Sequence, residues 1–353
     1  AVRAFLDATH ERYRASVGDE FGKTIRGIFT DEPNYAMFKM RQGRRTWHPW
    51  ARDLQEDFRA RFGYDLVGRL PELSFAVEGR EVSTVRGHYY RWLTDRFVSS
   101  YSEQIGRWCS RHRLPLTGHI LEEQTLHSQI SCVGACMPHY EHFQVPGIDI
   151  LTENGMRGRL EFLTAKQASS VASQMGRPRV MTEIYGCTGW DFPFEGYKFV
   201  GDWQQALGVN YFVHHLSWYT MKGEAKRDYP ASIFTQSPWW KHYRLLADYF
   251  GRVSLAMSRG RPIRNLLVVH PVESGWLTFL RDHRHATASL NDALERLTDF
   301  LLYHQFDFDF GDESLLARHG SVRKGSPARL RVGEMSYEAV VVPESLTLRA
   351  STL

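Results

Sequence analysis

The sequence has no long apolar run and no cluster of basic residues. Its 353 residues contain no stretch of ~18 apolar side chains, the length that a membrane-spanning helix needs, so a membrane partner is not expected. The net charge is only +4, and lysines and arginines form no basic stripe, which argues against nucleic acid as a partner. What remains is the composition of a globular protein long enough to bury a large core.

Cysteine is scarce, and its spacing predicts no metal site. The four cysteines are Cys109, Cys132, Cys136 and Cys187. Only Cys132 and Cys136 lie close together, and no second pair completes a zinc site, so buried free thiols are expected. His139 and His142 are three residues apart, but no firm third ligand accompanies them, and no bound metal is predicted here.

Nucleotide-binding motifs are absent as well. The segment from Val17 to Thr24 looks like a phosphate-binding loop, but a valine stands in place of its first glycine and the segment precedes a predicted strand. No G-x-G-x-x-G pattern follows any predicted strand, and no internal repeat occurs. A nucleotide-binding doubly wound sheet is therefore disfavoured.

Short apolar runs alternate with longer stretches of helical periodicity, which is typical of parallel β/α units. The strand-like runs are Thr24–Thr30, Leu114–His119, Gly147–Leu151, Arg179–Tyr185 and Val209–His214. The predicted helices cover Tyr90–Trp108, Leu160–Met175, Tyr197–Leu207 and Trp239–Met257. Long insertions follow the strands, whereas the connections into strands are short, as in a barrel whose active site lies at the carboxyl ends of its strands.

The first insertion, between Asp31 and Gly87, carries a predicted helix that Gly63 ends as a C-terminal cap. A change of character near Gly260 marks a second, smaller α/β domain. Its predicted elements are the strand Ile263–His270, the helix Ala286–Tyr303 and the strands Asp307–Phe310 and Ala339–Val342. We therefore expect a barrel domain over 1–260 and a second domain over 261–353.

Acidic residues stand at two places where catalytic groups of such a barrel belong. Asp31 and Glu32 follow the first strand-like run directly, and Glu183 interrupts the apolar fourth run. A lone acid in a buried strand is costly unless it faces a polar cavity. Glycoside hydrolysis needs one carboxyl group to protonate the leaving oxygen and a second to attack the sugar or activate water, so Glu32 and Glu183 are the predicted catalytic pair. The alternative is that each acid pairs with an arginine or caps a helix.

The residues that carry these acids resemble a known group of enzymes. Thr30-Asp31-Glu32-Pro33 is similar to the N-E-P motif that ends the fourth strand of clan A glycoside hydrolases, where the glutamate is the acid/base. Glu183 then falls on the seventh strand, where that clan keeps its nucleophile. The resemblance implies an α/β fold, a (β/α)₈ TIM barrel of which strands four to eight are present and the N-terminal strands are missing.

Longer stretches resemble α-L-rhamnosidase-like enzymes, glycoside hydrolase family 106 and its relatives. The similar segments include Phe62-Gly-Tyr-Asp-Leu66, Gly118-His-Ile-Leu-Glu122, Val145-Pro-Gly-Ile-Asp149 and Ser237-Pro-Trp-Trp-Lys-His-Tyr243. Phe308-Asp-Phe-Gly-Asp-Glu313 resembles the flavodoxin-like (glutamine amidotransferase-like) module that follows the barrel in these enzymes and in some bacterial β-galactosidases. Clan A enzymes retain the anomeric configuration, whereas the rhamnosidase family is thought to invert it and to use calcium. No ligand motif in the sequence supports calcium.

The resemblance and the strand ends together predict which side chains hold the sugar. The substrate-binding candidates are Asp31, His119, Glu122, Trp190, His214, Trp218 and Tyr219. Glu122 or its neighbour Glu123 could serve as a substitute acid, and a loop salt bridge is an equally good account of either. Of His214 and His215, one is expected to reach the pocket, because neighbouring strand residues point to opposite faces.

The expected function is hydrolysis of terminal sugars from poly- or oligosaccharides, with rhamnoside as substrate. Two alternatives stay open: a β-galactosidase-like hydrolase, and a carbohydrate-binding barrel that has lost catalysis. Five barrel strands alone would leave open sheet edges, which predicts aggregation. The second domain is the expected contact if copies of the chain form a homo-oligomer. The chain begins with Ala1 rather than Met, which is compatible with an upstream targeting segment and leaves the compartment undecided.

Overall fold

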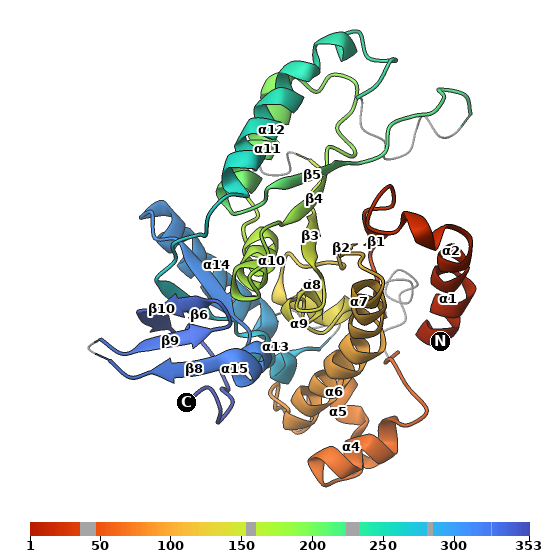
Figure 1. The fold of residues 1–353 in the computed structure, drawn as a ribbon. Helices are drawn as coiled ribbons and strands as arrows, with labels where there is room; N and C mark the ends of the chain where they lie inside the picture. The colour runs from red at the N-terminus through yellow and green to blue at the C-terminus, as the bar shows by residue number, and fades with distance from the viewer. Residues whose placement is uncertain (36–46, 153–159, 224–232, 281–284, 326) are drawn as a thin grey trace.

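The computed structural model describes residues 1–35, 47–152, 160–223, 233–280, 285–325 and 327–353. Its centre is a curled parallel sheet that forms half of a barrel (Figure 1). The strands are β1 (Ile28–Thr30), β2 (Leu116–Gly118), β3 (Val145–Asp149), β4 (Met181–Ile184) and β5 (Tyr211–His214). They lie in sequential order, with each strand parallel to the next and with β1 and β5 at the two edges. All five carboxyl ends therefore meet along one rim of the sheet.

Helices follow each strand and cover the outer face of the half-barrel, as right-handed β/α units require. These helices are α6 (Thr84–Ser100), α7 (Ser102–Arg111), α8 (Leu126–Cys132), α9 (Met137–Tyr140), α10 (Leu163–Gln174), α11 (Phe194–Ala206) and α12 (Arg244–Met257), the last preceded by a 3-10 turn, η4 (Trp240–His242). The amino terminus adds α1 (Val2–Ala8), α2 (His10–Val17) and η1 (Gly18–Glu20). The five strands and most helices were thus predicted, with ends shifted by a few residues.

The predicted helix over Tyr90–Trp108 is wrong in one respect, because it is two helices. Ser83 begins the first, accepting hydrogen bonds from two backbone amides of the first turn. At Tyr101 the backbone leaves regular helical geometry, with φ −112° and ψ −76°. The Tyr101 hydroxyl lies 2.6 Å from the Thr30 hydroxyl, so the break fixes this tyrosine against the end of β1.

The insertion after β1 forms its own short helices: α4 (Leu54–Phe62), η2 (Val67–Arg69) and α5 (Pro71–Ser74). Gly63 ends α4 as predicted, with φ +82° and its amide hydrogen-bonded to the Arg59 carbonyl. Leu54 and Phe58 are fully buried, so the predicted apolar face of this helix packs into the core.

A second layer of structure begins after α12. A parallel three-stranded sheet has the order β11 (Ala339–Val341), β6 (Leu266–Val269) and β7 (Phe308–Gly311), and the helices α13 (Val272–Thr278), α14 (His285–Tyr303) and α15 (Glu313–His319) connect it. An antiparallel sheet with the order β10 (Met335–Tyr337), β9 (Arg329–Val332) and β8 (Gly320–Arg323) extends beside it (Figure 1). The sequence analysis did not predict this antiparallel sheet.

The second layer packs tightly on the half-barrel. Helix α10 contacts both β3 and β7, and α13 lies against α6. At Gly87 a Cβ atom would sit 2.6 Å from the end of the Leu277 side chain, so a larger residue there would require that side chain to move. One hydrophobic core includes residues from both sides of position 260, and the proposed boundary there remains a prediction.

The four cysteines form no disulfide in the part of the chain that the structure describes. Three are buried as expected, but Cys187 is exposed, which corrects the prediction for that residue. Its φ of +56° places it in a turn just after β4. No helix among the described residues combines the length and apolarity needed to cross a membrane.

Candidate active site

The carboxyl rim of the half-barrel collects a group of ionisable side chains. They are Asp31 and Glu32 after β1, His119 after β2, Asp149 at the end of β3, Glu183 in β4 and His215 after β5. A parallel sheet places such residues on one edge, where side chains from successive strands converge. Several of them come from positions that the sequence analysis singled out.

Close packing of β1 against β2 sets the position of His119. Gly118 has φ +121°, and a Cβ there would lie 1.9 Å from the Thr30 carbonyl oxygen, so no other residue fits. The next amide, of His119, donates a hydrogen bond to that same carbonyl at 3.2 Å. The backbone at the end of β2 therefore directs the His119 ring toward the rim.

His119 and Glu183 form a buried ion pair at the centre of the site. His119 Nε2 lies 2.8 Å from Glu183 Oε2, and Nδ1 lies 3.3 Å from the Ile120 carbonyl oxygen. Burial alone would lower the pKa of His119, but the hydrogen bond to Glu183 and the nearby carboxylates of Asp149 and Glu123 raise it to about 9. The same hydrogen bond lowers the pKa of Glu183. Both groups are therefore charged at neutral pH.

Asp149 is a site residue that the sequence analysis quoted only as part of a family segment. It pairs in register with Glu183, and its Oδ1 is buried without a hydrogen-bond partner among the described residues. Burial, together with the nearby charge of Glu183, raises its pKa to about 7 despite the opposing charge of His119. In the sequence, its position near the end of a predicted strand was the feature that could have identified it as a site residue.

Of the two neighbouring acids Glu122 and Glu123, only Glu123 lies behind the site. Glu123 is buried, its Oε1 accepts a hydrogen bond from the Tyr140 hydroxyl at 3.0 Å, and burial raises its pKa. Glu122 is half-buried, and its carbonyl accepts a hydrogen bond from Ser128. Substrate binding by the Glu122 side chain remains a prediction.

Glu32 is half-buried beside this group. Its charge contributes to the raised pKa values of both Glu123 and Asp149, so its carboxylate lies near these two acids. Its backbone has φ +44°, and Glu122 and Tyr185, which follow other strands of the sheet, also have positive φ. Strained backbone of this kind concentrates at functional sites. Asp31 is largely exposed, with Oδ1 3.7 Å from His119 Nε2.

The two adjacent histidines after β5 differ in position. His215 Nε2 lies 3.8 Å from Glu183 Oε1, so it borders the site. His214 Nε2 lies 2.5 Å from the hydroxyl of Tyr243, a residue that leads into α12. The sequence analysis expected one of the pair to reach the pocket and favoured His214, and the structure brings His215 there instead.

The aromatic candidates form a stacked pair. The rings of Trp190 and Trp218 are 4.5 Å apart and nearly parallel, at 10°. Trp218 is buried beneath, whereas Trp190 is 42% exposed, so Trp190 presents a flat apolar face to solvent. Tyr219 is almost completely exposed.

Three of the site residues could hold a metal ion. Asp31, His119 and Glu183 each offer a ligand atom, and these atoms lie within 4.8 Å of one another. Among the described residues no other group of three qualifies, and His139 instead lies 2.7 Å from the Ser102 hydroxyl. Calcium does not fit these three atoms, because it takes six to eight oxygen ligands and this group offers two carboxylate oxygens beside the nitrogen of His119.

Replacing His119 with glutamine should shift the pH dependence of the hydrolysis that the sequence predicts. Without the imidazolium, the pKa of Glu183 rises, so the acidic limb of kcat/KM is expected to move to higher pH. Activity at pH 5 should then fall more than activity at pH 8. The measurement is a kcat/KM profile between pH 4 and pH 9.

His214→Gln is the matched control, because His214 contacts Tyr243 and not Glu183. Its acidic limb should coincide with that of the unaltered protein. An unchanged limb in His119→Gln would show that Glu183 is not the group whose ionisation limits the reaction.

Known proteins resemble this chain in sequence and in fold. A glycoside hydrolase family model described as alpha-L-rhamnosidase matches residues 1–353. The solved rhamnosidase from Novosphingobium sp. PP1Y matches with a TM-score of 0.71 and 19% identity, over 99% of this chain and 32% of that one. A β-galactosidase from the Antarctic haloarchaeon Halorubrum lacusprofundi matches with a TM-score of 0.52 and 14% identity, over 87% of this chain and 50% of that one.

These structural likenesses show the fold, which is that of glycoside hydrolases. The chain spans about a third of the rhamnosidase's length and half of the β-galactosidase's. No curated protein matches the chain.

Proposed function

The chain belongs to the alpha-L-rhamnosidase family of glycoside hydrolases, which implies a carbohydrate substrate, and from this premise we propose that it hydrolyses terminal α-L-rhamnosyl bonds with Glu32 and Glu183. The observation that carries the proposal is the ion pair between His119 and Glu183 at the carboxyl rim. A carboxylate kept ionised in a partly buried site is what a nucleophile or a general base requires. Among the described residues no lysine or arginine pairs with Glu183, which favours catalysis over a binding-only barrel.

The two carboxyl groups then take different roles. Glu183, whose pKa is lowered by the hydrogen bond from His119, acts as the ionised partner that attacks the anomeric carbon or deprotonates water. Glu32 is the general acid that protonates the leaving oxygen. This role rests on the likeness of Thr30-Asp31-Glu32-Pro33 to the motif whose glutamate is the acid/base.

The stacked tryptophans supply a surface for the sugar. The exposed face of Trp190, supported by Trp218, can pack against the apolar face of a pyranose ring. Asp31, which lies near His119, and Tyr219, which follows Trp218 in the chain, are both exposed and are proposed to bind sugar hydroxyls. Glu122 and His119 complete the proposed set, with His119 acting through Glu183, and His215 takes the place that was predicted for His214.

We also propose the finer description of the fold. The sequential strand order of β1 to β5 supports their assignment as strands four to eight of a TIM barrel. The parallel order β11-β6-β7 supports a flavodoxin-like second domain over 261–353. Since calcium does not fit Asp31, His119 and Glu183, we assign it no residue in this site.

A panel of aryl glycosides tests the function. We expect cleavage of the aryl α-L-rhamnoside and little cleavage of the β-galactoside, with the anomer first released identified by NMR. Inversion would make Glu183 a base acting through water, and retention would make it the nucleophile. Preference for the β-galactoside would favour the related hydrolase instead. Binding of rhamnose without cleavage of any substrate would leave a carbohydrate-binding barrel.

A further inference from the structure

A cavity lies at the end of the half-barrel opposite to the candidate active site. Its volume is about 480 Å³, and it borders Val180 and Asn210, which immediately precede β4 and β5. Glu183 and His215 stand toward the other ends of the same strands. The cavity also borders Asp307 and Met335, so both structural layers contribute to its wall. Nothing in the proposed hydrolysis uses it.

Arginines dominate the charge of this cavity. Arg177, Arg259, Arg261 and Arg264 line it, against two acids, Asp307 and Glu334. The acids are already engaged: Asp307 pairs with Arg264 and with Lys166, and Glu334 lies 3.7 Å from Arg261. Within the described part of the chain, Arg177 and Arg259 have no acidic partner. Two positive charges therefore remain in excess.

One of these two arginines, Arg177, has a buried hydrogen-bond donor that lacks an acceptor among the described residues. The Nε atom of Arg177 is buried and has no hydrogen-bond partner among the described residues. A donor removed from water without an acceptor costs free energy, and native proteins rarely leave one so. An acceptor on a bound molecule would satisfy it.

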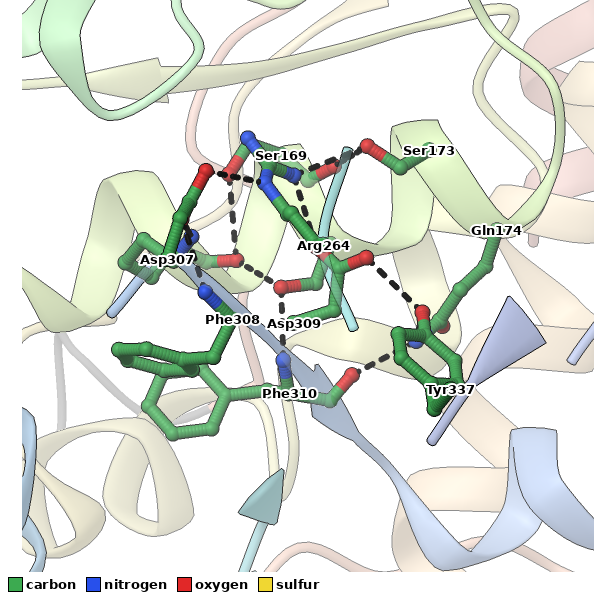
Figure 2. A network of polar contacts seen from close by, with 11 residues as sticks. Ser169, Ser173, Gln174, Arg264, Asp307, Phe308, Asp309, Phe310 and Tyr337 are labelled. Atoms are coloured by element: carbon green, nitrogen blue, oxygen red, sulfur yellow. Dashed lines mark hydrogen bonds and ion pairs between the residues drawn. The ribbon is translucent and has the colours of Figure 1, made fainter. Parts of the chain in front are cut away.

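Arg264 lines the cavity and is held there by a network of polar contacts (Figure 2). Its Nε donates to Asp307 at 2.8 Å, and Nη1 donates to Asp309 at 2.7 Å and to Ser173 at 3.0 Å. Arg264 is 95% buried, and Asp309 is completely buried beside Tyr337, which donates to it at 2.8 Å. The network fixes two nitrogens of the guanidinium, whereas Nη2 donates no hydrogen bond to any described residue.

The Nη2 side of Arg264 lies against a glycine. A Cβ at Gly208 would be 3.1 Å from Nη2, and Gly208 has φ +106°, a conformation that side chains rarely adopt. Gly208 also lines the cavity, so its missing side chain keeps space beside the guanidinium. The carbonyl end of α10 borders the cavity too and favours cations, but its equivalent of about half a charge is smaller than the arginine excess.

We propose that this cavity binds a small molecule through a phosphate-type oxyanion, which Arg177, Arg259 and Arg264 contact. Arginine binds phosphate oxygens with paired, charge-assisted hydrogen bonds. The volume exceeds that of an inorganic anion and falls in the range of about 300–1,000 Å³ usual for small-molecule sites. Because the wall includes both layers, the ligand also stabilises their contact by mass action.

Titration of the protein with inorganic phosphate, glucose 6-phosphate and glucose at constant ionic strength tests this, with binding read by calorimetry and by Tm. Both phosphates should bind saturably and raise Tm, whereas glucose should not. Tighter binding of glucose 6-phosphate identifies an organic phosphate as occupant, and equal binding identifies the free oxyanion. Failure of both phosphates to bind, or equal effects of glucose, overturns the proposal.

Variants locate the binding. Arg177→Gln and Arg259→Gln should each weaken binding of phosphate about tenfold or more, as loss of a charged hydrogen bond predicts. Arg252→Gln is the matched control, because Arg252 is exposed on α12 and does not line the cavity. All three positions are at least partly exposed, so the variants should fold. Equal affinity in all four proteins would mean that phosphate binds elsewhere and would refute the site.

Discussion

Replacing Glu183 with glutamine should lower kcat on an aryl rhamnoside by about 10²–10⁴ while the fold persists. Glutamine has the same shape and can still accept a hydrogen bond from His119, which lies 2.8 Å from the Glu183 carboxylate. It cannot ionise, so it can neither attack the anomeric carbon nor deprotonate water. Steady-state kinetics gives the rate, and circular dichroism gives the fold.

Glu32→Gln should show a different dependence on the substrate. A general acid matters most when the leaving group is a poor one, because a good leaving group departs without a proton. Loss of Glu32 is therefore expected to slow an alkyl rhamnoside by about 10²–10⁴ and a dinitrophenyl rhamnoside much less. Glu183→Gln should slow both substrates to a similar extent.

The control for both variants is Glu195→Gln, an exposed acid in the first turn of α11. Its kinetics should equal those of the unaltered protein. Full activity in either Glu32→Gln or Glu183→Gln would refute the proposed pair. If Glu183→Gln, and not Glu32→Gln, shows the dependence on the leaving group, the two residues form the catalytic pair with their roles reversed.

The sequence predicted the half-barrel because its strands have a strong local signal. Buried parallel strands appear as short β-branched runs, and all five were placed within a few residues. The antiparallel sheet of β8, β9 and β10 was missed although Val332-Gly333-Glu334-Met335 joins two alternating runs through a two-residue turn. Gly333 has φ +55° there, as such a turn requires. The signal was present but lay outside the β/α pattern that guided the prediction.

The site was predicted only in outline, because its chemistry depends on contacts between distant segments. Strand ends indicated Glu32, Glu183 and His119, yet nothing local shows that His119 Nε2 faces Glu183, 64 residues away. The distinction between His214 and His215 depends on which face of β5 each side chain takes. A shift of one residue in the predicted strand reverses that assignment.

The largest loss of stability is expected from Arg86, a residue that the sequence did not mark. Arg86 is completely buried in α6, and its guanidinium donates to backbone carbonyls instead of carboxylates. Nε donates to Leu277 at 3.1 Å, Nη1 donates to Glu72 at 3.1 Å and to Phe75 at 3.4 Å, and Nη2 donates to Glu81. One side chain thus joins the insertion after β1, helix α6 and helix α13.

Arg86→Met should lower the free energy of unfolding by about 3–5 kcal/mol, since the methionine fills the space but leaves buried carbonyl oxygens without donors. Denaturant unfolding measures this as a lower midpoint at an unchanged m-value. Arg96→Met on the same helix is the control. Arg96 is 46% exposed and pairs with an equally exposed Asp53, so its loss should cost less than about 1 kcal/mol.

Arg86→Lys separates the charge from the geometry. Lysine keeps the positive charge, but its single ammonium group cannot reach carbonyls that surround a planar guanidinium on several sides. If the hydrogen bonds hold α6 against α13, Arg86→Lys should lose most of the stability that Arg86→Met loses. A lysine variant as stable as the unaltered protein would show that the buried charge alone is sufficient. If Arg86→Met lowers the free energy of unfolding no more than Arg96→Met does, neither the charge nor the hydrogen bonds of Arg86 stabilise the fold.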